Sequence, residues 1–143
     1  ETIYSILGEK TKPKNQKLSK IVKKAPKIYS EFGYLELLSN IQDIHNRIRA
    51  CDMSPGASIP MLNGQNGRIK LYNSKIINNL KRISYTNNIQ VKIEDNGFFL
   101  EQGSFAVEIH TIQWPGKRRI DTSNFLKGYR ERGYFSIFGN KIL

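Results

Sequence analysis

A stretch of eight lysines near the N-terminus constrains most strongly what this chain can fold into. Residues 10–27 read KTKPKNQKLSKIVKKAPK and contain no acidic residue. Pro13 and Pro26, with polar residues between them, disfavour a long regular helix because proline lacks the amide proton of the helical ladder. Lysines are rarely buried, so this stretch contributes little to a hydrophobic core. We therefore expect an irregular, extended arm followed by a folded domain.

The positive charge of the chain is concentrated in this arm. The whole chain has 23 basic and 12 acidic residues, a net charge of +11, and without the eight lysines it has 15 basic and 12 acidic residues, a net charge of +3. Lysine is a mobile point charge that suits phosphates and lacks the planar fork of arginine. The arm therefore predicts sequence-tolerant contact with a nucleic-acid backbone. A solvated linker and an arm that binds an anionic membrane surface are the alternatives.

The rest of the chain predicts one small domain. With 143 residues, of which 38% are hydrophobic, the chain can form one modest core. We expect residues 1–9 to be the remnant helix of an upstream domain, residues 10–30 to be the basic arm, and residues 31–143 to be the folded domain. Because the chain begins with Glu1 and not with Met, we expect a processed form or a fragment.

The cysteine content and the hydropathy indicate an intracellular protein. Cys51 is the single cysteine, so no disulfide can form within the chain. No apolar run approaches the roughly 20 residues that a membrane-spanning helix needs. We therefore expect an intracellular compartment and no membrane partner.

The clearest helical pattern spans residues 39–51. Ser39 and Gln42 have the spacing of a capping box, which predicts that the helix begins at Ser39. The apolar residues that recur on one helical face are Ile41, Ile44, Ile48 and Cys51. A Ser-Pro-Gly sequence at residues 54–56 then stops the helix and turns the chain.

The sequence from Ala57 onward has the pattern of short β-strands. Pro60 suits an edge strand, and the Asp-Asn-Gly sequence at residues 95–97 is typical of a hairpin turn. The strands are expected at residues 58–62, 68–77, 89–94, 98–101 and 105–114, with a loop at 78–88. Five or six strands and one main helix predict an α+β, mostly β, fold: a small, partly open barrel of the OB type. A β-sandwich is the alternative.

The C-terminal part has a second basic cluster, a short helix and a mixed tail. Lys117, Arg118 and Arg119 follow the last predicted strand. Residues 121–124 offer helix N-cap side chains, and Gly128 ends the short amphipathic segment that follows. Basic and aromatic residues alternate in the tail from Tyr129. We favour a tail docked on the barrel over a tail that contacts RNA.

The residue types that usually carry catalysis are scarce. His45 and His110 are the only histidines, and neither has a second His, a Cys or an Asp at metal-ligand spacing. Cys51 has the pattern of a small buried apolar residue. No glycine-rich loop of a nucleotide-binding type is present. The residues therefore predict a binding module without a catalytic centre or a bound metal.

Three segments, in order along the chain, resemble the C-terminal domain of methionyl-tRNA formyltransferases. The first is APKI at residues 25–28. The second is IHNRIRA at 44–50 with SPGA at 54–57. The third is IQ at 112–113, GKRR at 116–119 and DTSNFLKG at 121–128. The family's signature reads I-x-N-x-I-R-A followed by W-P-G-A. Ser54 stands where the family has an aromatic residue, and Leu-Glu-Leu at 35–37 stands where it has Ile-Asp-Trp.

This resemblance implies an OB-like domain and a basic linker that together hold initiator methionyl-tRNA. In the family, a separate N-terminal domain binds 10-formyltetrahydrofolate and transfers the formyl group. The resemblance therefore implies no catalytic residue and no cofactor in this chain, and it implies an upstream catalytic domain and tRNA, or another structured RNA, as partners. DNA is not expected. The compartment implied is the bacterial cytoplasm or the mitochondrial matrix.

The two basic groups are the predicted RNA-binding residues. They are Lys10, Lys12, Lys14, Lys17, Lys20, Lys23, Lys24 and Lys27 in the arm, and Lys117, Arg118 and Arg119 in the second cluster. A non-enzymatic RNA-binding module of an organellar ribonucleoprotein and the C-terminal domain of a sugar-nucleotide formyltransferase are the alternatives. An open reading frame with about 170 or more upstream residues, the size of a domain, favours the enzyme over the module.

Overall fold

The computed structural model describes residues 25–78, 88–140 and 142. Of the predicted arm lysines, Lys27 lies within these residues, and the other seven lie outside them. The helix predicted at residues 1–9 and most of the loop predicted at 78–88 also lie outside the described residues.

The described residues form short strands, two α-helices and three 3₁₀ turns. In chain order they are η1 (Ser30–Gly33), η2 (Leu35–Leu37), α2 (Ile41–Ala50), β1 (Ala57–Pro60), η3 (Leu62–Gly64), β2 (Arg68–Asn78), β3 (Gln90–Glu94), β4 (Gly97–Gln102), β5 (Phe105–Gln113), β6 (Arg119–Asp121), α3 (Thr122–Gly128) and β7 (Gly133–Ser136). The α2 and α3 helices have 10 and 7 residues, so neither is long enough to cross a membrane. The predicted mostly β, OB-like fold is confirmed.

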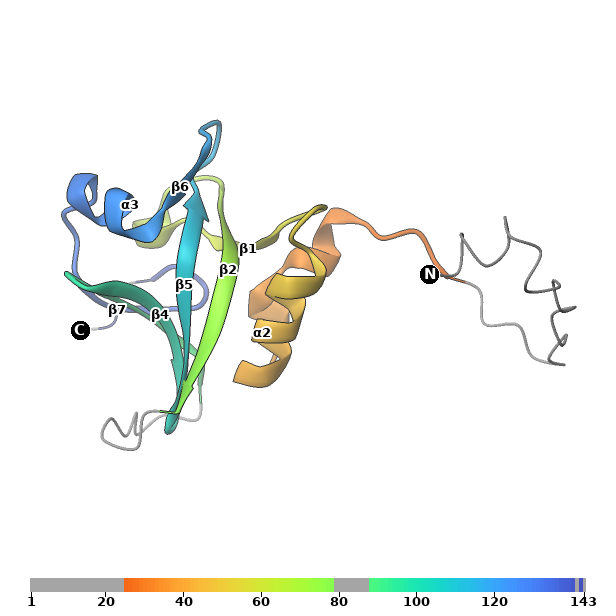
Figure 1. Cartoon of the computed structure of the whole chain (residues 1–143), viewed down its shortest axis with the longest axis horizontal. Coiled ribbons are helices and arrows are strands. Elements are labelled where there is room, and N and C mark those ends of the chain that lie inside the picture. The colour runs from red at the N-terminus through yellow and green to blue at the C-terminus, as the bar shows by residue number, and fades with distance from the viewer. Residues whose placement is uncertain (1–24, 79–87, 141, 143) are drawn as a thin grey trace, which may run out of the picture.

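The strands form one curled antiparallel sheet in the order β1-β2-β5-β4-β3-β7, with β6 paired to the end of β5. Figure 1 shows the sheet bending around its long central strands into a half-barrel. The longest pairing joins β2 to β5, from Lys70 opposite Gln113 to Asn78 opposite Phe105. A single curled sheet excludes the β-sandwich.

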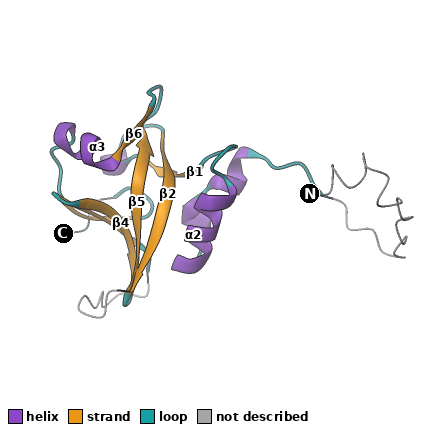
Figure 2. Ribbon diagram, viewed as in Figure 1, coloured by secondary structure: helices purple, strands orange, loops and turns teal. Residues whose placement is uncertain are grey.

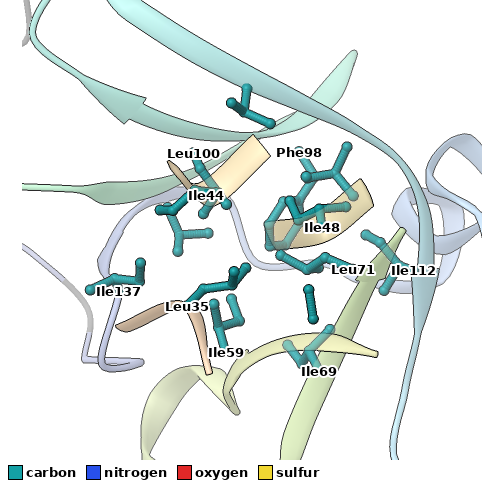
Figure 3. Close-up of a cluster of buried hydrophobic side chains, with 14 of the residues drawn as sticks. Leu35, Ile44, Ile48, Ile59, Ile69, Leu71, Phe98, Leu100, Ile112 and Ile137 are labelled. Atoms are coloured by element: carbon teal, nitrogen blue, oxygen red, sulfur yellow. The ribbon is translucent and has the colours of Figure 1, made fainter. Parts of the chain in front are cut away.

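The hydrophobic core lies between α2 and the curled sheet. Ile44 and Ile48 of α2 are fully buried, as are Leu71, Phe98 and Ile112 from three strands. Figure 3 shows these side chains gathered in one cluster. In Figure 2, α2 lies beside β2 and α3 lies near β6, and both helices contribute side chains to this cluster. The predicted helical face of α2 therefore does pack into the core.

Several local predictions are confirmed. The β3–β4 hairpin turns at residues 95–96, with Glu94 opposite Gly97. Pro60 ends β1, which stands at the edge of the sheet. The C-terminal tail docks on the sheet, because its β7 strand pairs with β3 and buries Phe135 completely.

Two predictions need correction. The helix N-cap is Asn40 and not Ser39, because the Asn40 side chain accepts a 2.8 Å hydrogen bond from the backbone N–H of Asp43. The strands β6 and β7 were not expected from the sequence. Both are short, with three and four residues, and neither has a clear alternation of apolar and polar side chains.

Candidate nucleic-acid interface

The point where the arm joins the domain is held in place by two arginines. Arg47 of α2 stacks on the ring of Phe32 at 3.8 Å and donates a hydrogen bond to the Phe32 carbonyl. Arg68 of β2 stacks on Tyr34 at 3.7 Å and pairs with the Glu36 carboxylate at 2.6 Å. Arginine suits both tasks because its planar group can stack and donate hydrogen bonds together. The arm therefore leaves the domain from a fixed site beside α2 (Figure 1).

A close backbone contact adds to this anchoring. A side chain at Gly33 would overlap the carbonyl oxygen of Gly56, so η1 packs directly against the α2–β1 connection. Lys27 and Tyr29 precede η1 and are exposed, with the Lys27 ammonium 5.5 Å from the centre of the Tyr29 ring. Lys27 is thus placed on the surface, next to an exposed aromatic ring.

The second basic cluster divides into two exposed side chains and one that is engaged within the domain. Lys117 and Arg118 lie exposed in the turn between β5 and β6. Arg119 stacks on Tyr72 at 3.6 Å and donates a 2.6 Å hydrogen bond to the backbone carbonyl of Asp52. The Arg119 guanidinium is also 3.5 Å from the Asp52 carboxylate. Arg119 therefore ties β6 to the α2–β1 connection.

These contacts bring η1 and Arg119 of the second basic cluster to the same connection. Arg119 contacts Asp52 at the start of the α2–β1 connection, and Gly33 of η1 packs on Gly56 at its end. The η1 turn that follows the arm and Arg119 of the second cluster therefore meet the same connection, although they are far apart in sequence. The assignment of all these residues to RNA contact stays a prediction.

A polar hollow that sequence reasoning missed lies next to this connection. It has a volume of about 590 Å³ and lies between the end of α2 and strands β2 and β5, with Arg49, Arg119, Ser74 and Thr111 in its wall. Asn73, also in its wall, has a φ of 49°, a left-handed conformation that asparagine tolerates better than most residues. The hollow is assembled from elements far apart in sequence. The sequence signal that could have pointed to this hollow was Arg49, which lies one helical turn after His45 on the predicted helix.

His45 ties α2 to β2 beside this hollow. Its Nδ1 atom is 2.9 Å from the hydroxyl oxygen of Ser74. Burial lowers the pKa of His45, and the nearby charge of Arg49 lowers it further. The surroundings of His45 therefore favour its neutral form, and its contact with Ser74 joins two elements of the fold.

The other residues considered for chemistry are His110 and Cys51. His110 lies 3.8 Å from the Glu108 carboxylate, and both are partly exposed. Cys51 is fully buried, as predicted, and burial raises the pKa of its thiol. Within residues 25–78 and 88–140, no three His, Cys, Asp or Glu side chains are grouped so that they could hold a metal ion.

Known proteins resemble the chain over most of its length. Residues 27–130 match the family described as formyl transferase, C-terminal domain. A methionyl-tRNA formyltransferase from Syntrophomonas wolfei is 37% identical over 86 residues, which are 60% of this chain and 26% of that protein. One from Chlorobium phaeovibrioides is 30% identical over 110 residues, which are 77% of this chain and 34% of that protein. The chain thus spans about a quarter to a third of the length of these relatives.

The fold also has a counterpart among solved structures. A crystal structure of a HypX variant from Aquifex aeolicus superposes with a TM-score of 0.57 at 16% sequence identity. The superposition covers 87% of this chain and 22% of that chain. At this identity the likeness concerns the fold alone.

Proposed function

Because this chain belongs to the formyl transferase C-terminal domain family, we propose that it is the tRNA-binding C-terminal region of a methionyl-tRNA formyltransferase. It positions initiator methionyl-tRNA for formylation by a separate catalytic domain. The relatives from Syntrophomonas wolfei and Chlorobium phaeovibrioides support this proposal over a sugar-nucleotide formyltransferase, since both carry the name methionyl-tRNA formyltransferase. Any 10-formyltetrahydrofolate would be bound by that catalytic domain, outside this chain.

The observation that carries the proposal is the charge of the arm. Eight lysines within 18 residues make a cation track that suits the phosphates of an RNA backbone and that a small sugar nucleotide does not need. The arm joins the domain at a site fixed by Arg47 and Arg68, so RNA held by the arm would be held at a defined position relative to the domain. Positioning by electrostatics and shape needs no catalytic residue in this chain.

The salt dependence of RNA binding tests this proposal. If the eight lysines engage about eight phosphates, the logarithm of the affinity for tRNA should fall with the logarithm of salt concentration at a slope of roughly −6 to −7. The measurement is a filter-binding or anisotropy titration of the full chain with initiator tRNA between 50 and 200 mM salt. A slope near −1 would exclude the arm as the main contact.

Single substitutions in the second cluster separate binding from folding. Lys117→Gln and Arg118→Gln should each make the salt slope shallower by roughly 0.7–0.9, since each removes one exposed phosphate contact. Neither should change the midpoint of thermal unfolding. Arg119→Lys is the matched control. It keeps the positive charge but loses the stacking on the Tyr72 ring and the guanidinium hydrogen bond to the Asp52 carbonyl. It should lower the unfolding midpoint and leave the slope unchanged.

An unchanged slope in both the Lys117 and the Arg118 variants would remove the β5–β6 turn from the RNA surface. It would leave the arm as the proposed contact, because the arm is tested by the slope of the unmodified chain.

A further inference from the structure

An aromatic hollow lies between the end of β5 and α3. Trp114 directly follows β5, and its ring centre is 5.6 Å from that of Phe125 and 5.8 Å from that of Tyr129. Phe125 and Tyr129 stack on each other at 5.0 Å. Ile120 and Gly128 complete the apolar wall of a hollow of about 350 Å³, which is at the small end of the range for ligand sites. Phe125 is buried, whereas Trp114 and Tyr129 are partly exposed, so these two rings offer aromatic surface to a small, flat ligand.

Basic residues lie near this hollow, although no charged residue of the described part of the chain lines it. No acidic residue is among the residues that line it, and its polar wall residue is Asn124. The backbone N–H of Lys117 donates a 3.0 Å hydrogen bond to the Trp114 carbonyl, so a tight turn follows Trp114, and the exposed residues Lys117 and Arg118 lie in this turn and directly after it. Lys127 of α3 donates to the Asn124 side chain at 3.2 Å. An anion next to the hollow would therefore meet cations.

The larger hollow on the other side of α3 is a poor site for an anion. It has a volume of about 720 Å³, and Asp95, Glu108 and Asp121 are in its wall. The three carboxylates would repel a phosphate. They outnumber Lys127 and Arg132, the lysine and arginine in that wall. Among the described hollows, the aromatic one combines partly exposed aromatic rings with basic residues nearby.

We propose that the aromatic hollow at Trp114 binds one unpaired base of the RNA, while Lys117 and Arg118 hold the adjoining phosphate; the proposal rests on the proposed RNA-binding function. Every base has a flat face that stacks on an indole or a phenol ring, so the contact tolerates any sequence. An apolar peptide would gain no electrostatic attraction from the nearby basic residues, whereas a nucleotide would. A nucleotide is therefore the favoured occupant.

The state of Tyr129 fits this role. Burial, with the nearby charge of Glu131, raises the pKa of Tyr129 to about 12, while the charge of Arg132 acts in the opposite direction. The Tyr129 hydroxyl therefore keeps its proton at physiological pH.

The intrinsic fluorescence of the protein reports directly on this site, because Trp114 is the only tryptophan in the chain. Titration of the full chain with a short single-stranded RNA should quench this fluorescence to saturation, since a base stacked on the indole quenches its emission. Inorganic phosphate at the same ionic strength should not quench it. Quenching by an apolar peptide together with no quenching by RNA would overturn the proposal.

Two substitutions test the hollow without relying on a single variant. Trp114→Ala should weaken the binding of single-stranded RNA roughly 5- to 150-fold. Gly128→Leu should give a similar loss while the protein stays folded. Gly128 is the last residue of α3 and lies in the wall of the hollow, and a Cβ added there would have no atom within 4 Å. We therefore expect leucine to extend into the hollow without displacing the core.

Phe105→Ala is the matched control. Phe105 is an exposed aromatic residue at the opposite end of β5, outside the hollow, and its loss should leave RNA affinity unchanged. If RNA binds with a steep salt slope but neither quenches Trp114 nor responds to Gly128→Leu, the proposal for the hollow is overturned and the proposed function stands. If RNA does not bind at any salt concentration, both are overturned.

Discussion

Replacing the eight arm lysines with glutamine is expected to abolish most of the affinity for tRNA. The unmodified chain should lose about 10³- to 10⁵-fold in affinity between 50 and 200 mM salt, because each phosphate contact releases counterions. The variant should bind weakly at 50 mM and should change little as salt is raised. Affinity and its salt slope, measured by anisotropy with labelled initiator tRNA, check both parts of this result.

A variant with all eight lysines replaced by arginine is the control for charge. It keeps the net charge of +11, so it should keep the affinity and the steep slope, because contact with the backbone depends on charge more than on the shape of the cation. Thermal unfolding of the domain should be the same in all three proteins, since the arm adds little to the core. Undiminished tRNA affinity in the glutamine variant would overturn the proposed function.

Replacing Phe135 with alanine should destabilise the domain by about 3–5 kcal/mol. Phe135 is fully buried in β7, and the strand that carries it pairs with β3, from Gln90 opposite Ser136 to Ile93 opposite Gly133. The loss removes a large side chain from the core and weakens the docking of the whole C-terminal segment. Since small domains are stable by only about 5–15 kcal/mol, chemical denaturation should show a large shift of the midpoint.

Phe138 supplies a control three residues away. Its side chain is 62% exposed in the turn after β7, so Phe138→Ala should change the free energy of unfolding by less than about 0.5 kcal/mol. A similar loss for both variants would mean that β7 is not held by its buried ring. A loss of tRNA affinity in the Phe138 variant, with stability unchanged, would revive the alternative that the tail contacts RNA.

The elements that sequence predicted well are those set by local chemistry. The apolar spacing of Ile41, Ile44 and Ile48 predicted the helix and the face that it buries. The Asp-Asn-Gly sequence predicted the β3–β4 hairpin because such residues accept the backbone angles of a tight turn. In each case the deciding interactions lie within a few residues of each other, so the sequence pattern contains them.

The start of α2 shows where local chemistry was insufficient. Ser39 and Asn40 are both good N-cap residues, and their spacing to later polar residues does not choose between them. A contact from β4 chooses: the Gln102 side chain accepts a 3.0 Å hydrogen bond from the N–H of Ile41 and donates a 2.7 Å bond to the carbonyl of Ser39. A glutamine 61 residues further along the chain thus fixes the backbone on both sides of Asn40.

The sequence alone determined that this chain is a small, mostly β domain with a strongly cationic arm, because charge density and apolar periodicity are properties of neighbouring residues. Only the tertiary structure decided that Arg119 is engaged with Tyr72 and Asp52 while Lys117 and Arg118 stay exposed. The tertiary structure also brought Trp114 and the residues of α3 together to form the aromatic hollow. Such arrangements depend on which distant segments meet across a folded sheet, and no local pattern in the chain encodes that meeting.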